Sequence, residues 1–199
     1  QTDCQRYLPI SSNKIIHLKY GIQMPNKIIN SNDRKKIFDR FELNDKSFTI
    51  GIFSRIEEQK GQHLVVEALN SMNNKDIQLL IIGHCMDNKY LDKLNNMIEE
   101  FKLQKQISIT PFIESPMELM PLLDLVILPT YEETFGLVVA EAMLMGTPVI
   151  GSNAGGVPEI IEDRINGLLF EPKNYKSLKE EIISIYDSLE LRKKLSDNA

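Results

Sequence analysis

The sequence predicts an α/β fold in which a parallel sheet carries helices on both of its faces. Short apolar runs alternate with helix-like stretches along the chain, and this alternation is typical of βαβ units. Two of the runs, Leu79–Ile82 and Leu125–Leu128, also lack the polar–apolar alternation of a half-exposed strand. Uninterrupted apolar runs are typical of strands that are covered on both faces.

The expected elements follow from this alternation in chain order. Strands are predicted at Lys14–Leu18, Ser47–Phe53, Ile77–Ile82, Gln106–Thr110, Leu125–Leu128 and Pro148–Gly151. Helices are predicted at Asp33–Phe41, Gly61–Met72, Asn88–Phe101, Met117–Leu122, Phe135–Met145, Val157–Ile161 and Tyr175–Ser188. The polar, helix-prone stretch 24–45 leads into the sheet. Residues 1–13 fit this pattern poorly and are interpreted as a tail from something upstream.

Composition excludes several classes of protein. The chain has 199 residues, 42% apolar and 26% charged, with a net charge of −5. This is an ordinary globular composition, and a nucleic-acid-binding surface would need a basic stripe instead. Cys4 and Cys85 lie far apart without a metal-binding spacing, so we expect reduced thiols, no metal site and a cytoplasmic protein. No apolar run has the length of a transmembrane helix, and the polar start does not resemble a signal peptide.

The expected helix at Phe135–Met145 contains one unusual residue. From Leu137 to Met145 every position is apolar except Glu141, which predicts a helix buried all round. A lone carboxylate in such a place is costly unless something pairs with it. The partner is either nearby backbone, which makes Glu141 structural, or a ligand group such as a sugar hydroxyl.

The polar residues and glycines gather where the expected strands end, which is where open parallel sheets bind ligands. The helix that begins near Gly136 points free N–H groups at the loop before it, and Arg55 and Lys60 add two positive charges, a combination that suits a diphosphate. The alternative is that both are surface residues paired with Glu57 and Glu58.

Glu133 and Gly155-Gly156 have two interpretations each, and two histidines have one each. The Glu133 carboxylate contacts either a second polar group or a charge that develops during a reaction. The alternative is an acid that the helix dipole favours at the start of a helix. Gly155-Gly156 allows a close backbone approach or forms a plain turn. Among the histidines, His63 falls in an expected helix and is interpreted as structural, whereas His84 follows a strand end and is a candidate ligand contact. Dinucleotide-binding and P-loop patterns are absent.

Taken in this order and at these spacings, the motifs resemble the C-terminal domain of retaining glycosyltransferases of the group 1 type (family 4), which have the two-domain GT-B architecture. The motifs are Ser54-Arg55 with Lys60-Gly61, Ile82-Gly83, the run from Pro129 to Leu137, Glu141-Ala142, the run from Gly146 to Ile150, the run from Gly155 to Glu159, and Asn166-Gly167-Leu168-Leu169. The match runs from about Lys14 to the end of the chain. It implies a Rossmann-like domain, one half of a GT-B enzyme, that holds a nucleotide-sugar donor.

The resemblance also implies roles for residues. Arg55 and Lys60 bind the donor diphosphate, Glu141 binds the ribose hydroxyls, and Glu133 contacts the transferred sugar. Glu133, Arg55 and Lys60 are the candidate catalytic residues. The donor-binding set is Arg55, Lys60, Gly83, Thr134, Phe135, Gly136, Leu137 and Glu141. The family typically needs no divalent metal or other cofactor, because the basic pair and the helix dipole stabilise the departing diphosphate.

This sequence departs from the family pattern at His84-Cys85 and at Pro111, where the family often has glycine. Both segments usually lie near the nucleotide base, and we expect uridine diphosphate first and guanosine diphosphate second. Residues 14–199 are interpreted as the donor domain and residues 1–13 as the remnant of an upstream acceptor domain, so that the fragment alone is expected to be inactive.

The expected enzyme transfers a sugar with retention to an acceptor glycan or lipid-linked sugar, in polysaccharide or glycoconjugate biosynthesis. It acts in the cytoplasm, and peripheral association of the full enzyme with the inner face of the membrane is compatible with such an acceptor. The alternatives are a nucleotide-sugar-binding domain without transferase activity and a related GT-B sugar-nucleotide epimerase.

Overall fold

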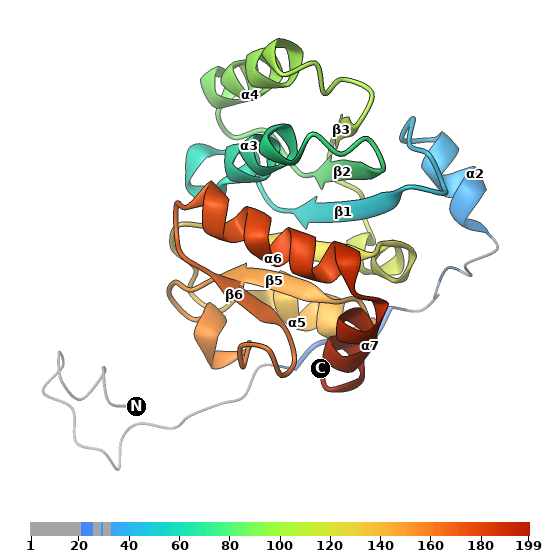
Figure 1. Cartoon of the computed structure of the whole chain (residues 1–199), viewed down its shortest axis with the longest axis vertical. Helices are drawn as coiled ribbons and strands as arrows, with labels where there is room; N and C mark the ends of the chain where they lie inside the picture. Colours follow the sequence, from blue (N-terminus) through green and yellow to red (C-terminus); the bar gives the residue numbers. More distant parts are fainter. Residues whose placement is uncertain (1–20, 26–28, 30–32) are drawn as a thin grey trace, which may run out of the picture.

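The structure is a computed structural model that describes residues 21–25, 29 and 33–199. The expected strand Lys14–Leu18 and the segment 1–13 lie outside these residues. The described part forms the α/β architecture that the sequence predicts, with six parallel strands in one sheet (Figure 1).

The strands pair in the spatial order β3-β2-β1-β4-β5-β6. Their bounds are β1 Phe48–Phe53, β2 Ile77–Ile82, β3 Ile107–Thr110, β4 Leu125–Leu128, β5 Val149–Ser152 and β6 Leu168–Phe170. The expected strands from Ser47 to Gly151 are all present to within a residue or two. β6 was not predicted as a strand, because its three residues are too few to stand out as an apolar run.

The helices lie between and after the strands. They are α2 Arg34–Asp39, α3 Gln62–Met72, α4 Asn88–Glu100, α5 Leu137–Leu144, α6 Tyr175–Asp187 and α7 Leu189–Asp197. Single 3₁₀ turns occur at Glu58–Lys60, Pro116–Glu118, Met120–Leu122 and Val157–Glu159.

Proline explains where two helix predictions were wrong. The segment Met117–Leu122 forms two 3₁₀ turns, each with a proline near its start, instead of an α-helix. Pro121 has no N–H to donate to the preceding turn, so an α-helix cannot run through it. The segment Val157–Ile161 is likewise reduced to a 3₁₀ turn that contains Pro158.

A serine explains the helix that was not expected at all. Ser188 has an extended backbone that ends α6, and its hydroxyl accepts a hydrogen bond from the N–H of Leu191. This side-chain cap begins α7 at once, so the chain continues as a second helix where the sequence predicted an end.

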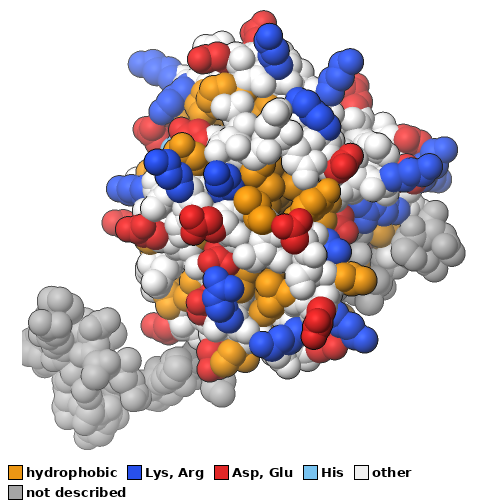
Figure 2. Space-filling view, viewed as in Figure 1, with side chains coloured by type: hydrophobic (Ala, Val, Ile, Leu, Met, Phe, Trp, Pro, Cys, Tyr) orange, Lys and Arg blue, Asp and Glu red, His pale blue; other side chains and the backbone are white. Residues whose placement is uncertain are grey.

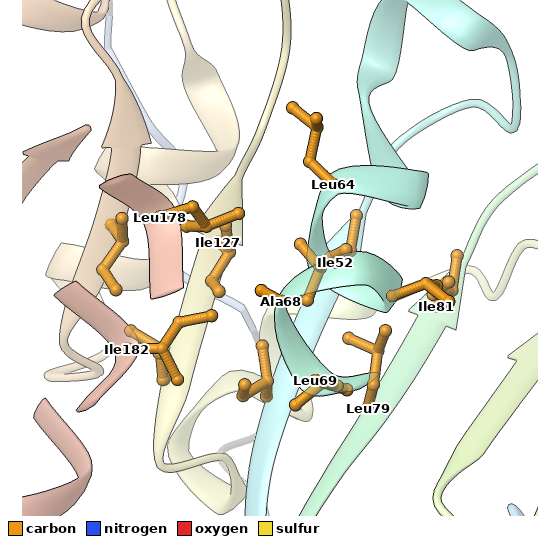
Figure 3. Close-up of a cluster of buried hydrophobic side chains, with 14 of the residues drawn as sticks. Ile52, Leu64, Ala68, Leu69, Leu79, Ile81, Ile127, Leu178 and Ile182 are labelled. Carbon is orange, nitrogen blue, oxygen red and sulfur yellow. The ribbon is translucent and has the colours of Figure 1, made fainter. Parts of the chain in front are cut away.

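The core has two layers, one on each face of the sheet. On one face, α3, α4, α6 and α7 pack on strand residues such as Ile52, Ile81 and Ile127. Figure 3 shows side chains of α3 and α6 beside these strand residues. On the other face, α2, α5 and the three 3₁₀ turns after β3 pack on the alternate strand residues, such as Leu80 and Val126. Residues of β1, β2, β4 and β5 are buried at every position, as expected for strands covered on both faces.

The surface on the α3 and α6 side carries both signs of charge. Figure 2 shows lysine and arginine side chains interspersed with aspartate and glutamate over this face. Within the described residues, no helix reaches the length and apolarity needed to cross a membrane.

Candidate functional site

The candidate site lies where the order of the strands reverses. From β1 the chain moves outward to β2 and β3, and then returns to place β4 on the other side of β1. In open parallel sheets, ligands bind beyond the carboxyl ends of the strands at such a switch point. Two cavities open there: one of about 340 Å³ at the loop after β4, and one of about 290 Å³ over the ends of β1 and β2. Val138 of α5 lines both.

The first cavity is formed by the segment between β4 and α5. Its walls are Leu128, Glu133, Thr134, Phe135, Gly136, Leu137 and Val138. Residues 129–136 are called the Glu133 loop below. Gly136 ends this loop with a φ of 94°, a left-handed conformation that favours glycine, and it supplies no side chain to cap α5. The first turn of α5 therefore starts without a side-chain cap, beside the cavity.

Glu133, which lines this cavity, forms an ion pair with Lys60. The Lys60 Nζ lies 3.0 Å from Glu133 Oε2, and both side chains are mostly buried, with 16% and 21% of their surfaces exposed. The N–H of Thr134 donates to the other carboxylate oxygen, Oε1, at 3.0 Å. The pairing expected between Lys60 and the nearby acids Glu57 or Glu58 is not formed. The structure instead brings together two residues 73 positions apart that the sequence had assigned to one ligand.

Arg55 does form one of the surface pairs that the alternative interpretation expected. Its guanidinium lies 2.8 Å from Glu57 Oε1, while 57% of the arginine side chain remains exposed. Glu58 pairs with Lys93 at 3.0 Å. Arg55 nevertheless lines the second cavity, so its exposed guanidinium can turn toward a ligand there at the small cost of a surface pair.

Glu141 lies on the wall of the second cavity. It is half-buried, and burial raises the pKa of its carboxyl above the ordinary value. Within the described part of the chain its carboxylate forms no hydrogen bond or ion pair, so the backbone-bonded structural carboxylate is not what the fold contains. The site therefore holds an acid whose charge no other described residue balances.

The helix that carries Glu141 is less buried than its sequence predicted. Leu137 is 37% exposed and Leu144 45% exposed, whereas Val139, Ala142 and Met143 are buried. The prediction of a helix buried all round was wrong because α5 lies in the outer layer of the molecule. Only one side of it meets the sheet.

Two glycine motifs pack against the protein backbone. A Cβ at Gly83 would lie 1.8 Å from the carbonyl oxygen of Ser54, so the glycine lets the ends of β1 and β2 approach each other. A Cβ at Gly155 would lie 1.9 Å from the carbonyl oxygen of Glu133, and the N–H of Gly156 donates to that oxygen at 2.8 Å. Gly155-Gly156 thus forms a turn that packs closely on the backbone of the Glu133 loop.

Several residues of the site were not singled out from the sequence. Phe112 lines the second cavity and stacks on His84, with ring centroids 4.9 Å apart and planes 17° from parallel. Buried below the site, His63 contacts the hydroxyls of Tyr90 and Tyr131. The hydroxyl contacts of His63 and the ring stack of His84 each join residues that are distant in sequence. No local sequence pattern indicates such contacts. His63 was correctly interpreted as a helix residue, but its polar partners were not foreseen.

Among the described residues, no cluster of three or more His, Cys, Asp or Glu side chains is placed to hold a metal ion. The groups that line the two cavities are instead an arginine, two carboxylates and the start of a helix, and a lysine pairs with one of the carboxylates. Cations and free N–H groups suit phosphate oxygens, and a carboxylate suits hydroxyl groups.

Comparison with known proteins agrees with this geometry. A family model described as glycosyl transferases group 1 matches residues 33–199. The chain is 27% identical over 170 residues to the alpha-D-kanosaminyltransferase of Streptomyces kanamyceticus, which covers 83% of this chain and 43% of that protein.

Two solved structures are similar in fold and sequence. The Anabaena HepE protein in complex with UDP and glucose has a TM-score of 0.81 and 27% identity, over 85% of this chain and 46% of that one. A second structure of HepE holds UDP-glucose. The C-terminal domain of a group 1 family glycosyl transferase from Francisella tularensis has a TM-score of 0.73 and 31% identity, over 83% of this chain and 88% of that one. The chain spans less than half the length of the kanosaminyltransferase and of the HepE protein.

Proposed function

Because the chain belongs to the group 1 glycosyl transferases, we propose that its described part binds a nucleoside-diphosphate sugar for transfer to an acceptor. The observation that carries the proposal is the arrangement of four side chains at the switch point of the sheet: Glu133 lines the first cavity, Arg55 and Glu141 line the second, and Lys60 pairs with Glu133. Arg55 and Lys60 follow the carboxyl end of β1, whereas Glu133 and Glu141 follow that of β4.

The diphosphate is assigned to the space between the start of α5 and the two basic side chains. Lys60 and Arg55 neutralise its charge, and the uncapped N–H groups of α5 add hydrogen-bond donors. These groups stabilise the negative charge that develops on the diphosphate as the sugar leaves. The proposal assigns no part of this role to a divalent metal.

Glu133 is assigned to the transferred sugar. Its carboxylate neutralises Lys60 at 3.0 Å when no donor is present. A bound diphosphate competes for the same lysine, because phosphate oxygens form strong charge-assisted hydrogen bonds with an ammonium group. Donor binding therefore releases Glu133 from Lys60 and leaves its carboxylate available to sugar hydroxyls.

The ribose and the base are assigned to the second cavity. Glu141 accepts hydrogen bonds from ribose hydroxyls, and the base lies near the stacked rings of His84 and Phe112. Uridine is preferred over guanosine, which the UDP complexes of the similar Anabaena protein support. The proposal has three further parts. The sugar is transferred with retention of configuration, an acceptor domain lies upstream of residue 14, and the enzyme acts in polysaccharide or glycoconjugate synthesis.

A thermal-shift panel tests the donor assignment directly. UDP, GDP and their glucose and mannose conjugates are titrated against the chain, and a ligand that binds only the folded state raises Tm. We expect the largest shift with a uridine nucleotide. An absence of any shift, checked by calorimetry, would contradict the proposal.

The phosphate assignment has a matched pair of variants. Lys60→Ala should weaken UDP binding at least about tenfold, the scale of a lost charge-assisted hydrogen bond. Lys93→Ala removes a lysine that also forms an ion pair at 3.0 Å, but with the exposed Glu58 outside the cavities. Its affinity for UDP should remain that of the wild type. Equal losses in the two variants would assign the effect to net charge alone.

A further inference from the structure

The first turn of α3 contains a buried histidine that joins two tyrosines. His63 is 8% exposed. Its ring Nδ1 lies 2.9 Å from the hydroxyl of Tyr90 in α4, and its Nε2 lies 2.8 Å from the hydroxyl of Tyr131 in the Glu133 loop. The imidazole thus bridges a helix of the core and the loop that closes the first cavity.

The surrounding donors fix the tautomer of this ring. The backbone N–H of His63 donates to the Tyr90 hydroxyl at 3.2 Å, so that hydroxyl is free to give its own proton to Nδ1. The ring proton then resides on Nε2 and is donated to the oxygen of Tyr131. A neutral imidazole has one donor and one acceptor, which matches this pair of partners. Burial, and then the charge of Lys93, lower the pKa of His63 and favour this neutral form, while Glu58 opposes the shift.

Further contacts hold the same loop against the 3₁₀ turn Glu58–Lys60, just before α3. The N–H of Tyr131 donates to the carbonyl of Gln59 at 2.8 Å, and the hydroxyl of Thr130 contacts the same carbonyl oxygen at 3.3 Å. A Cβ at Gly61 would lie 2.1 Å from the carbonyl oxygen of Pro129, so the turn and the loop are in direct contact.

The neighbouring side chain holds the loop that follows β1. Gln62 is fully buried, and its amide nitrogen donates to the carbonyl of Arg55 at 2.7 Å and contacts the hydroxyl of Ser54 at 3.0 Å. Lys60 lies in the 3₁₀ turn that precedes α3. The start of α3 is therefore attached to each of the loops that carry Arg55, Lys60 and Glu133.

We propose that His63 is a positioning residue for donor binding: through Tyr131 it fixes the Glu133 loop relative to Lys60, and so sets where the Glu133 carboxylate meets the sugar. The inference rests on the proposed function. Small displacements of a group that must meet a ligand weaken the interaction strongly, because its geometry is no longer that of the bound state. Loss of the His63–Tyr131 hydrogen bond should therefore affect the sugar more than the diphosphate.

Four variants separate this role from simple stability. Tyr131→Phe removes only the hydroxyl that His63 holds. His63→Asn retains a polar atom near the position of Nδ1 but does not reach Tyr131. His63→Gln extends an amide toward the position of Nε2 and restores a donor to Tyr131. Tyr186→Phe is the control, since Tyr186 packs edge-on against Phe48 at the opposite ends of the strands.

Affinities for UDP and UDP-glucose are measured by calorimetry, or for the GDP pair if the panel selects guanosine. We expect Tyr131→Phe and His63→Asn to weaken UDP-glucose about fivefold, the factor for one ordinary hydrogen bond, and UDP by less than about twofold. His63→Gln and Tyr186→Phe should bind both ligands as the wild type does. Thermal unfolding verifies that each variant is folded, and Tyr131→Phe carries the test if the His63 variants are not.

Two outcomes overturn the proposals, and they are distinct. If the wild type binds neither nucleotide pair, the proposed function fails, and the role of His63 fails with it. If the wild type binds but Tyr131→Phe loses UDP and UDP-glucose by the same factor, or loses neither, the proposed function stands and the positioning role of His63 is wrong.

Discussion

At the scale of single residues, Glu141 is the acid whose surroundings oppose its charge. Burial raises the pKa of its carboxyl, and no described side chain or backbone group pairs with it. Because its pKa is raised, the Glu141 carboxyl holds its proton more tightly in the folded state than in the unfolded chain. The contribution of Glu141 to stability is therefore lost as pH rises above the ordinary pKa of 4.5. A residue that costs stability in the empty protein is expected where a ligand uses it.

Replacement of this acid should move stability and binding in opposite directions. Glu141→Gln should raise Tm at pH 7. The accompanying gain in the free energy of unfolding should be less than about 1 kcal/mol, because the group is half exposed and screened. The gain should shrink at low pH, where the wild-type carboxyl is protonated. The variant should also lose more affinity for UDP than for an analogue that lacks the ribose hydroxyls.

A second buried acid provides the control for that measurement. Burial also raises the pKa of Glu181, but its carboxylate accepts two hydrogen bonds from Arg164, the shorter at 2.8 Å. Glu181→Gln should therefore not stabilise the protein, and nucleotide affinity should stay unchanged. A lower Tm for Glu141→Gln would mean that the Glu141 carboxylate has a stabilising partner in the folded chain.

At the scale of elements, the turn after β5 packs against the backbone of the Glu133 loop. Gly155 has a φ of 57°, and a Cβ there would meet the carbonyl oxygen of Glu133 at 1.9 Å. Gly146, after α5, also has a positive φ, 74°, but its nearest neighbour would be the Ser196 hydroxyl at 3.6 Å. The two glycines share the backbone requirement and differ in what surrounds them.

Alanine at these two glycines should separate backbone strain from loop displacement. Gly155→Ala and Gly146→Ala should each cost roughly 1 kcal/mol of stability from the left-handed conformation alone. Only Gly155→Ala should push the Glu133 loop outward, and we expect it to weaken UDP-glucose binding at least about fivefold. Calorimetry and thermal unfolding of both variants check this. Equal affinities would mean that the loop keeps its place without the turn.

At the scale of the whole molecule, the buried histidine makes stability depend on pH. The pKa of His63 lies below its ordinary value of 6.5 in the folded state, so the unfolded chain takes up the proton first as pH falls. The stability that depends on neutral His63 is therefore complete above about pH 6.5. It is lost progressively below that pH, until His63 of the folded state is also protonated.

Urea unfolding between pH 5 and 8 measures this effect as a difference. The wild type should lose stability toward pH 5 relative to His63→Gln, which has no proton to bind. Subtraction of the two curves removes the acids Glu67, Glu141 and Glu181, whose raised pKa values are common to both proteins. Parallel curves would show that His63 has the same pKa in both states.

Local pattern predicted most of the fold and the members of the site, but few of their contacts. Buried strands such as Leu125–Leu128 are recognisable because each is a short, continuous apolar run. The three residues of β6 and the helix started by Ser188 were missed, since one is too short and the other depends on a single side-chain cap. The Lys60–Glu133 pair, the His84–Phe112 stack and the His63–Tyr131 bond each require the folded chain, because no sequence spacing brings these residues together.

The strand order also has a consequence for how the chain folds. In the sheet, β1, β2 and β3 pair with their neighbours in sequence, and so do β4, β5 and β6. Only the pairing of β1 with β4 joins the two halves, and it must close the long stretch of chain between Phe53 and Leu125. Closure of a long loop is entropically costly and slow, so this pairing is expected to form late. Because Arg55 and Lys60 follow β1 while Glu133 and Glu141 follow β4, the binding of a nucleotide during refolding would report the moment when the two halves of the sheet join.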